Sequence, residues 1–277
     1  MTRCEVGEEK GVKRRYALLG NPVKHSLSPL IHRAFAQDTQ KEVSYEAICV
    51  ALEEFAKEMK KLASEGFSGA NVTLPFKEEA FLLADDCTPE AQAAQSANTL
   101  AFREKIIAHN TDGLGLLRDL KDNLGQDILG ARLLLLGAGG AARAVVPALL
   151  GEKPKCLFVS SRTFMRAQVL AAAFPGVQAL PLEEAGAEHF DLVLNATSAG
   201  HAGLSPDVPR EALFGAFCYD LNYKDAAKPF LALAQSAGAK ERADGLGMLV
   251  AQAAESFLFW EGVLPSYQEV LKALRHA

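Results

Sequence analysis

The sequence has few cysteines, and none of them is spaced as a pair. The five cysteines of this 277-residue chain stand singly, at Cys4, Cys49, Cys87, Cys156 and Cys218. An odd number of isolated cysteines argues against a disulfide framework. The six histidines and five cysteines show no metal-ligand spacing. We therefore expect reduced cysteines, mostly buried as small apolar residues, and no bound metal.

Long apolar runs and an excess of positive charge are also missing. No window approaches the roughly 18 uncharged apolar residues of a membrane-spanning helix. The N-terminal segment MTRCEVGEEKGVKRR is charged and lacks the apolar core of a signal peptide. The net charge of −5 provides no broad basic face for nucleic acid. These absences predict a cytoplasmic protein with neither nucleic acid nor membrane as a partner. For the oligomeric state, a monomer and a homodimer both stay open.

Strand-like and helix-like segments alternate along the chain. In the first part, YALLG, EVSYEAICV and SGANVTL predict strands, and helices are expected from Ser28-Pro29, in LEEFAKEMKKLASEG and from Pro75. TLAFR and KIIAHN predict a hairpin around Glu104, near a sheet edge. This order of elements indicates an α/β protein.

After Asp112 the alternation becomes stricter. Six strands are predicted, in ARLLLLG, KCLFVS, GVQALP, FDLVLNAT, FCYDLNY and the region after Gly238. Continuous apolar runs of this kind are typical of a parallel sheet covered on both faces, hence of a doubly wound fold. DGLGMLVAQAAESFLFWEGVLP predicts a long final helix. With hinges after Asp112 and at Asp244-Gly245, the expected domains are 1–112, completed by 245–277, and 113–244.

A glycine-rich turn separates the first of these six strands from a helix. In LLLLGAGGAARAVVPALL, Gly137, Gly139 and Gly140 permit a tight turn and a close approach of backbone N–H groups to a pyrophosphate. Ala142 occupies the place of the usual third glycine and is small enough for close packing. A plain strand–turn–helix is the alternative, but the flanking elements favour dinucleotide binding.

An arginine follows the next strand, in FVSSRTFMRA. A protein that binds NAD usually has an acidic residue there, to hold a ribose hydroxyl. Arg162 instead suits the 2′-phosphate of NADP, with Ser161 and Thr163 as further hydroxyl donors. Alternatively, Arg162 and Arg166 merely solvate the first turn of a helix. Because cations are unfavourable at a helix N-terminus, the pair indicates a compensating anion.

Four polar segments of the N-terminal half follow or precede predicted strands. They are GNPVKHSLSPLIH, NVTLPFK, SANT and NTDG. Ligands of open α/β sheets bind at such strand ends. The segments supply hydroxyls, amides, one ammonium and one carboxylate, which suit a small, polyhydroxylated anion.

With these motifs in order, the chain closely resembles the shikimate dehydrogenases. GNPVKHSLSP, NVTLPFK, NTDG, GAGGAAR and DGLGMLVAQAAESFLFW carry the resemblance, supported by NATSAG and YDLNY. It implies an N-terminal α/β substrate domain, a Rossmann-like NADP domain and a cleft between them. It also implies reduction of 3-dehydroshikimate to shikimate with NADPH, in the biosynthesis of chorismate and aromatic amino acids.

The resemblance also implies roles for individual residues. Lys77 and Asp112 match the catalytic pair, Lys77 acting either as a general acid or as an electrostatic stabiliser of the developing oxyanion. The residues that match substrate contacts, besides this pair, are Ser26, Ser28, Thr73, Asn98, Tyr223 and Gln252. The residues that match NADP contacts are Gly137, Ala138, Gly139, Gly140, Ala141, Ser161, Arg162, Thr163, Arg166, Leu221 and Gly245.

Taken one at a time, several of these residues have simpler explanations. Ser28 and Asp112 could be helix N-caps, and Lys77 could be a solvated surface lysine. The match of seven motifs in order favours the catalytic interpretation. His25 and His32 are expected to be structural.

Three other functions compete with this one. A quinate/shikimate dehydrogenase that prefers NAD would be expected to have an acidic residue in place of Arg162. An NADP-dependent folate-interconverting dehydrogenase would not require the two serines or NVTLPFK. A non-catalytic dinucleotide sensor would be expected to have lost Lys77 or Asp112. One residue departs from the family pattern, because Ser161 stands where asparagine is common.

Overall fold

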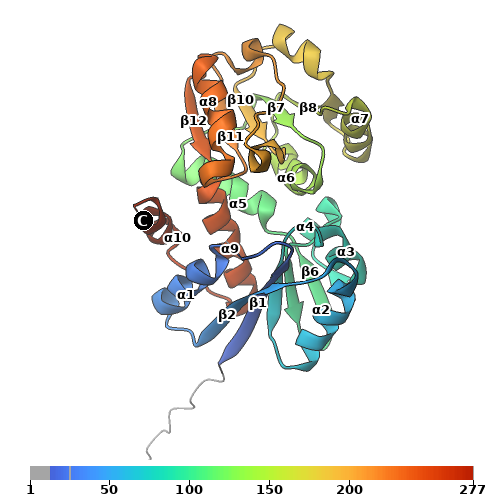
Figure 1. The fold of residues 1–277 in the computed structure, drawn as a ribbon, viewed down its shortest axis with the longest axis vertical. Coiled ribbons are helices and arrows are strands. Elements are labelled where there is room, and N and C mark those ends of the chain that lie inside the picture. Colours follow the sequence, from blue (N-terminus) through green and yellow to red (C-terminus); the bar gives the residue numbers. More distant parts are fainter. Residues whose placement is uncertain (1–12, 25, 277) are drawn as a thin grey trace, which may run out of the picture.

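The computed structural model describes residues 13–24 and 26–276 and contains two six-stranded sheets. In Figure 1 the first sheet and its helices form the lower, blue-to-cyan lobe, and the second sheet lies in the upper, green-to-orange lobe. None of the helices within the described residues is long and apolar enough to cross a bilayer.

The first sheet is mixed and has the strand order β2-β1-β3-β5-β6-β4. Its strands are β1 (Arg14–Gly20), β2 (Val43–Cys49), β3 (Gly69–Val72), β4 (Asp86–Cys87), β5 (Thr99–Phe102) and β6 (Ile106–His109). β1 pairs in parallel with β2 and β3, whereas β5 is antiparallel to both β3 and β6. The β5–β6 pair is the hairpin predicted around Glu104.

Helices cover both faces of the first sheet. They are α1 (Ser28–Thr39), α2 (Phe55–Ser64), α3 (Lys77–Leu83) and α4 (Pro89–Ala94), with a short 3₁₀ turn η1 (Leu52–Glu54). Ala17 and Leu19 of β1 pack with Phe55 of α2 on one face. Tyr16, from the same strand, stacks on Trp260 on the other face, with ring centroids 4.3 Å apart. Alternation along β1 thus builds two separate cores.

The second sheet is entirely parallel, with the order β12-β11-β10-β7-β8-β9. Its strands are β7 (Arg132–Leu136), β8 (Cys156–Ser160), β9 (Val177–Ala179), β10 (Leu192–Asn195), β11 (Phe217–Asp220) and β12 (Glu241–Asp244). Read from β9, this is the order 3-2-1-4-5-6 of a Rossmann sheet. The α/β class and the Rossmann-like second half predicted from the sequence are confirmed.

The leucines of β7 show why this sheet is covered on both sides. Leu133 and Leu135 belong to the core beneath α6, whereas Leu134 and Leu136 belong to the core on the opposite face. The helices around the sheet are α6 (Gly140–Gly151), α7 (Phe164–Ala173) and α8 (Lys228–Ser236). Short 3₁₀ helices lie in the connections, η3 (Leu182–Ala187), η4 (Ala199–Ala202), η5 (Arg210–Leu213) and η6 (Lys224–Ala226).

Three helices link or flank the two lobes. α5 (Asp112–Arg118) continues into a π-helical segment, η2 (Asp119–Asn123), and leads from the first sheet to the second. α9 (Leu246–Glu261) returns to the first lobe, and α10 (Tyr267–Arg275) packs on α9 and α1. The long helix predicted in DGLGMLVAQAAESFLFWEGVLP is therefore confirmed as α9, and a shorter helix, α10, follows it.

The expectation that the cysteines are mostly buried is wrong for the described residues. Cys218 is buried in β11, but Cys49 is exposed, and Cys87 and Cys156 are half-buried. Cys49 and Cys87 end the edge strands β2 and β4, which have a neighbouring strand on one side only. Cys4 lies outside the described residues.

Candidate active site

The polar segments of the first lobe meet at one edge of its sheet. β1 and β3 end there, with Leu19 paired to Val72. Thr99, at the start of β5, pairs with Asn71 of β3 and with His109 at the end of β6. Because these registers are continuous, the segments that follow Gly20, Val72 and His109, and the SANT segment before β5, lie next to one another.

An ion pair stands at this edge. Lys77, the first residue of α3, places Nζ 2.5 Å from Oδ2 of Asp112, the first residue of α5. The Lys77 side chain is 17% exposed and that of Asp112 is 8% exposed. Lys77 is therefore not a solvated surface lysine. Asp112 is not an N-cap either, because Thr111 occupies that position.

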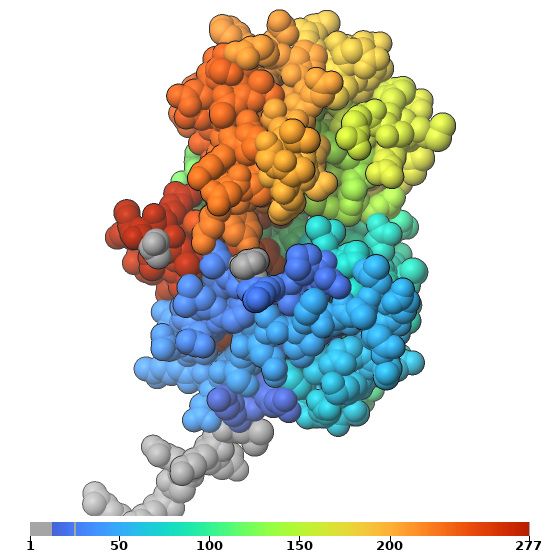
Figure 2. Space-filling model, viewed as in Figure 1, coloured from blue at the N-terminus to red at the C-terminus, as the bar shows by residue number. Residues whose placement is uncertain are grey.

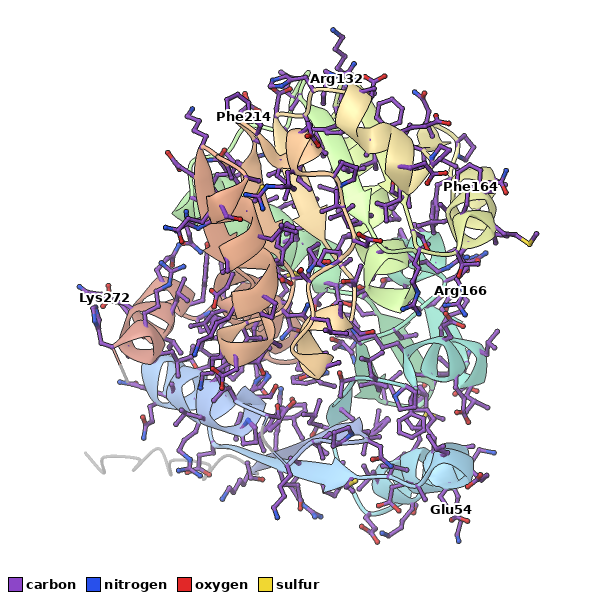
Figure 3. All side chains as sticks on the ribbon, turned by 45° about the horizontal axis from the view of Figure 1, so that its top comes forward. Glu54, Arg132, Phe164, Arg166, Phe214 and Lys272 are labelled. Carbon is purple, nitrogen blue, oxygen red and sulfur yellow. The ribbon has the colours of Figure 1, made fainter. Side chains whose placement is uncertain are left out.

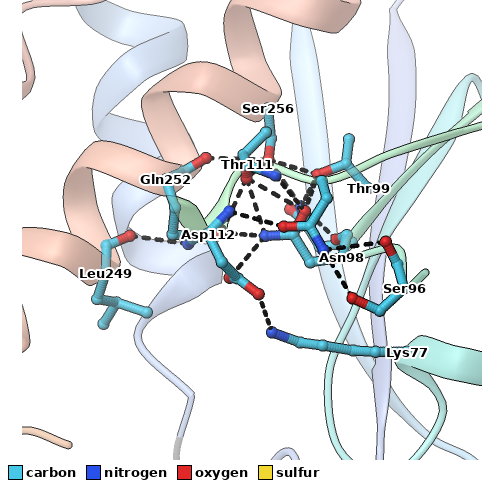
Figure 4. Close-up of polar contacts among 11 residues, drawn as sticks. Lys77, Ser96, Asn98, Thr99, Thr111, Asp112, Leu249, Gln252 and Ser256 are labelled. Carbon is cyan, nitrogen blue, oxygen red and sulfur yellow. Dashed lines mark hydrogen bonds and ion pairs between the residues drawn. The ribbon is translucent and has the colours of Figure 1, made fainter. Parts of the chain in front are cut away.

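Asn98 connects the ion pair to the rest of the site (Figure 4). Its Nδ2 lies 2.9 Å from Asp112 Oδ1, 2.8 Å from Thr111 Oγ1 and 3.1 Å from Gln252 Oε1. Its Oδ1 accepts the backbone N–H of Thr111 at 2.9 Å. Gln252 in turn donates to the carbonyl of Leu249 at 2.8 Å. A buried asparagine thus brings Asp112 and Gln252, which are far apart in sequence, to one point.

A second layer of polar side chains supports this arrangement, and sequence reasoning missed it. Ser256 Oγ accepts from Asn71 Nδ2 at 2.9 Å and lies 2.8 Å from Thr99 Oγ1 and 3.2 Å from Thr111 Oγ1. A signal was present, because Ser256 follows Gln252 by four residues on a mostly apolar helix, and such residues share a face.

The two serines lie together at the start of α1. Ser26 Oγ is 3.1 Å from Ser28 Oγ and accepts the backbone N–H of Ser28 at 3.2 Å. Leu27 is the N-cap of α1 and Ser28 the first helical residue, so the N-cap explanation for Ser28 is wrong. The capping hydroxyl comes from Ser26, one residue before the N-cap.

Thr73 and Tyr223 border the same region. The Thr73 N–H donates to the carbonyl of Leu19 at 2.9 Å, which holds Thr73 beside the end of β1. Tyr223 packs against a core that includes Leu27 and helix α9. Burial raises the pKa of the Tyr223 phenol, so its hydroxyl is a neutral donor or acceptor.

His32 belongs to the core beneath this edge. The side chain is fully buried in α1 and stacks on Tyr45, with ring centroids 4.2 Å apart. Neither ring nitrogen has a hydrogen-bond partner among the described residues. Burial lowers the pKa of His32 to about 3, so the imidazole is neutral near pH 7. His25 lies outside the described residues.

The glycine turn of the second lobe leaves open space in front of a helix. Gly137 has φ +104°, and a Cβ there would lie 3.1 Å from Ala196 C, so the turn itself requires glycine. A Cβ on Gly139 or Gly140 would meet no atom within 4 Å. This space adjoins the N-terminus of α6, whose free N–H groups bind anions. Ala138 lies in the turn, and Ala141 lies in the first turn of α6. The residues fit a pyrophosphate.

The side chains of Arg162 and Arg166, near this turn, are accessible to an anion from solvent. Leu136, before the turn, pairs with Ser160 at the end of β8, and Ser161 to Thr163 follow. Arg162, Thr163 and Arg166 are exposed, and Figure 3 shows Arg166 beside Phe164 at the outside of the upper lobe. Among the described residues, neither guanidinium is ion-paired. Two uncompensated cations at the start of α7 suit a phosphate.

Leu221 and Gly245 meet at the ends of β11 and β12. A Cβ on Gly245 would lie 2.3 Å from the carbonyl oxygen of Leu221, so glycine is required for this contact. The Leu221 N–H donates to the backbone carbonyl of Asn195 at 2.9 Å, and the side-chain Nδ2 of Asn195 donates to Asp220 Oδ2 at 2.9 Å. Burial raises the pKa of Asp220 to about 6. These bonds fix the loops beyond the sheet.

Helix α9 brings the two sheet edges together. It begins directly after β12, at the carboxyl edge of the second sheet, and Gln252 contacts Asn98 at the edge of the first. Further along, Trp260 Nε1 donates to the carbonyl of Leu100 in β5 at 3.0 Å. The edges of both sheets that carry the candidate site residues therefore lie beside the first half of α9, between its start at Leu246 and Gln252. Figure 2 shows a recess between the lobes, with green and dark red atoms at its base.

Three family models match successive parts of the chain. The shikimate dehydrogenase substrate binding domain matches residues 18–100, and the shikimate / quinate 5-dehydrogenase model matches residues 119–214. The shikimate 5′-dehydrogenase C-terminal domain matches residues 245–275.

Within residues 13–24 and 26–276, no cluster of three histidine, cysteine or acidic side chains could hold a metal ion.

Known proteins resemble the chain over nearly its whole length. A shikimate dehydrogenase (NADP(+)) of Aromatoleum aromaticum is 48% identical over 270 residues, which cover 94% of this chain and 96% of the relative. The crystal structure of an Ael1 enzyme from Pseudomonas putida has a TM-score of 0.89 and 41% identity, covering 94% and 98% of the two chains. Shikimate 5-dehydrogenase from Thermus thermophilus, solved with NADP(H) and shikimate, has a TM-score of 0.86 and 37% identity, covering 95% and 99%.

Proposed function

The chain belongs to the shikimate dehydrogenase family, and we propose that it catalyses the reversible, NADPH-dependent reduction of 3-dehydroshikimate to shikimate. The observation that carries this proposal is the Lys77–Asp112 ion pair at the edge of the first sheet. Helix α9 runs from this edge to the edge of the second sheet, which carries the glycine turn and the exposed side chains of Arg162 and Arg166. The reaction belongs to chorismate and aromatic amino acid biosynthesis.

In the proposed mechanism, the edge of the first sheet binds the substrate and the edge of the second sheet binds the cofactor. NADPH, when bound, supplies the hydride. Lys77 stabilises the negative charge that develops on the carbonyl oxygen, and this oxygen takes up a proton, from the Lys77 ammonium or from water, to become the hydroxyl of the product. Asp112 orients the ammonium and holds a neighbouring substrate hydroxyl. Asn98 fixes the position of Asp112, and Gln252 is held by Asn98. A ring hydroxyl of the substrate would replace one of the acceptors that Asn98 Nδ2 and its neighbours now share. Ser26 and Ser28 bind the substrate carboxylate, and Thr73 and Tyr223 complete the contacts.

The cofactor contacts are proposed for the second edge. The turn from Gly137 to Ala141 holds the pyrophosphate, with the N-terminus of α6 behind it. Arg162 binds the 2′-phosphate, supported by Ser161, Thr163 and Arg166. Leu221 and Gly245 border the nicotinamide end. An acidic residue, which would favour NAD, is absent from position 162.

We also propose domain boundaries and a location. Residues 1–112 and 245–277 form the substrate domain, because α9 and α10 pack on α1, and residues 113–244 form the NADP domain. The cytoplasm is the proposed location, since the described cysteines are free thiols. A monomer and a homodimer both fit the proposed reaction.

The test is reduction of 3-dehydroshikimate by the purified protein with NADPH, followed by identification of the product by nuclear magnetic resonance. We expect shikimate in a molar amount equal to the NADPH consumed. Absence of NADPH consumption, or a product other than shikimate, would contradict the proposal. The apo protein with NADPH alone is the control for unrelated oxidation.

A further inference from the structure

Asp119 is a buried carboxylate outside the proposed catalytic set. It is fully buried at the junction of α5 and the π-helical segment η2. Its Oδ2 accepts the hydroxyl of Tyr219 at 2.6 Å, and its Oδ1 accepts Asn123 Nδ2 at 2.8 Å. Burial raises the pKa of Asp119, and these hydrogen bonds oppose the rise. Burying a carboxylate is costly unless it is compensated, so its position requires an explanation.

The Asp119 carboxylate packs against the first turn of α9. A Cβ added to Gly247 would lie 1.9 Å from Asp119 Oδ1, so glycine alone permits this approach. The N-terminus of a 16-residue helix carries partial positive charge, which stabilises the carboxylate. Tyr219 comes from β11 of the second sheet. Asp119 therefore joins α5, β11 and α9 at one point.

Each of these three elements carries a part of the proposed site. α5 begins with Asp112, seven residues before Asp119, which is about two helical turns. β11 leads into Leu221, and α9 follows Gly245 and carries Gln252. A π-helical segment, such as the one that begins at Asp119, is common where a helix is adapted to function.

We propose that Asp119, through Tyr219 and the first turn of α9, is a positioning residue that aligns the cofactor edge with the Lys77–Asp112 pair. This inference rests on the proposed function. A misplacement of about 1 Å between reacting groups costs up to a hundredfold in rate. Loosening this junction should therefore slow hydride transfer more than it weakens cofactor binding.

Tyr219→Phe is the main test, because it removes one hydroxyl and keeps the ring in the core. A matched control exists at the opposite end of the same helix. Tyr16, also buried, donates its hydroxyl to Glu261 Oε1 at 2.7 Å, and Glu261 is the last residue of α9. Tyr16→Phe also removes a tyrosine–carboxylate bond to α9, but far from the proposed site.

Three quantities should be measured in each protein: kcat for shikimate oxidation, the Kd for NADP⁺ without substrate, and amide hydrogen exchange in the apo state. We expect Tyr219→Phe to lower kcat about tenfold or more, with a smaller change in Kd. Amides of residues 246–249 should exchange faster in this variant. Tyr16→Phe should keep kcat within about twofold and affect exchange at the C-terminal end of α9 instead.

Asp119→Asn is the second variant, and it decides the question if Tyr219→Phe cannot be recovered folded. The proposal is wrong if kcat stays within twofold, roughly the scatter of such comparisons, if exchange at 246–249 is unchanged, or if Tyr16→Phe loses as much rate. The rate of the unmodified protein tests the proposed function separately. Exchange at the first turn of α9 does not depend on that rate, so the two failures are distinguishable.

Discussion

At the edge of the first sheet the polar side chains proposed to contact substrate bind one another, whereas at the edge of the second sheet the two arginines proposed to contact the cofactor face solvent. Asn98 is buried and contacts Asp112, Thr111 and Gln252. Arg162 and Arg166 are exposed, and the space beside Gly139 is empty of other side chains. The first edge, proposed to bind the substrate, is thus organised without a ligand, and the second edge, proposed to bind the cofactor, is one that an anion would complete.

This difference follows from what each edge has to do. Groups that stabilise a transition state act best when they need not reorganise during the reaction, which favours a rigid, buried network. A phosphate is bound by backbone N–H groups and guanidinium groups that water can solvate while the site is free. Substitutions at the first edge should therefore affect turnover, and substitutions at the second edge should affect cofactor affinity.

The largest effect is expected at the first edge. Lys77→Met should lower kcat by about 10²- to 10⁴-fold, the range for loss of a catalytic proton donor or charge. The Kd for NADPH, measured by fluorescence titration, should change by less than about twofold, because Lys77 belongs to the other edge. Lys57→Met is the control, since Lys57 Nζ pairs with Glu54 on an exposed helix surface. Near-native turnover of Lys77→Met would show that Lys77 is not catalytic.

The next effect concerns the arginine of the second edge. Arg162→Ala should weaken NADP⁺ binding by about 1.5–3 kcal/mol, or roughly ten- to a hundredfold in Kd, because charged hydrogen bonds to phosphate are lost. Binding of NAD⁺, which lacks the 2′-phosphate, should be unaffected. Calorimetric titration measures both, and Arg103→Ala, an exposed arginine of the first lobe, is the control. Equal losses for the two cofactors would contradict the assignment of Arg162.

Gly139→Ala separates folding from binding at the second edge. A Cβ there meets no protein atom within 4 Å, and Gly139 has φ −93°, so the free energy of unfolding should be unchanged. NADP⁺ binding should weaken by about 1 kcal/mol, roughly fivefold in Kd, because the methyl group occupies the ligand's space.

Gly137→Ala is the contrasting variant for this prediction. With φ +104°, alanine at 137 is strained and should lower the free energy of unfolding, as urea denaturation would measure. Unchanged NADP⁺ binding by Gly139→Ala would show that the open space is not the pyrophosphate site.

The smallest effect is expected from the layer behind the catalytic pair. Ser256→Ala should lower the free energy of unfolding by about 1 kcal/mol and kcat only a few-fold, since Asn71 and Thr99 lose one hydrogen-bond partner. Urea denaturation and steady-state rates measure these changes. Ser236→Ala, which removes an exposed hydroxyl on α8, should change neither. Loss of activity as large as for Lys77→Met would contradict the supporting role of Ser256.

The sequence predicted the local backbone structure at the edge of the second sheet better than the side-chain packing at the edge of the first. A glycine turn, a parallel-sheet pattern and an arginine after the second strand are local features, and local features can be recognised along one chain. The network around Asn98 depends on Gln252 and Ser256, which lie more than 150 residues away and meet Asn98 and Thr99 through packing of α9. Hydrophobic periodicity predicted the helix but not which of its polar residues are buried.

Some details were wrong for physical reasons that only the tertiary structure shows. Ser28 is the first helical residue of α1 and not its N-cap, and its N–H is accepted by the Ser26 hydroxyl. Cys49 is exposed because β2 is an edge strand. Asp119 was not singled out from the sequence, because its burial depends on a close approach to Gly247, which is distant in sequence.

The most direct test of the central claim is the rate of shikimate oxidation by the unmodified protein with NADP⁺ and with NAD⁺, using quinate as the competing substrate. The account predicts a kcat/KM that is highest for shikimate with NADP⁺, and at least about tenfold lower with NAD⁺, given the proposed contact of Arg162 with the 2′-phosphate. A preference for NAD⁺, or for quinate over shikimate, would contradict it.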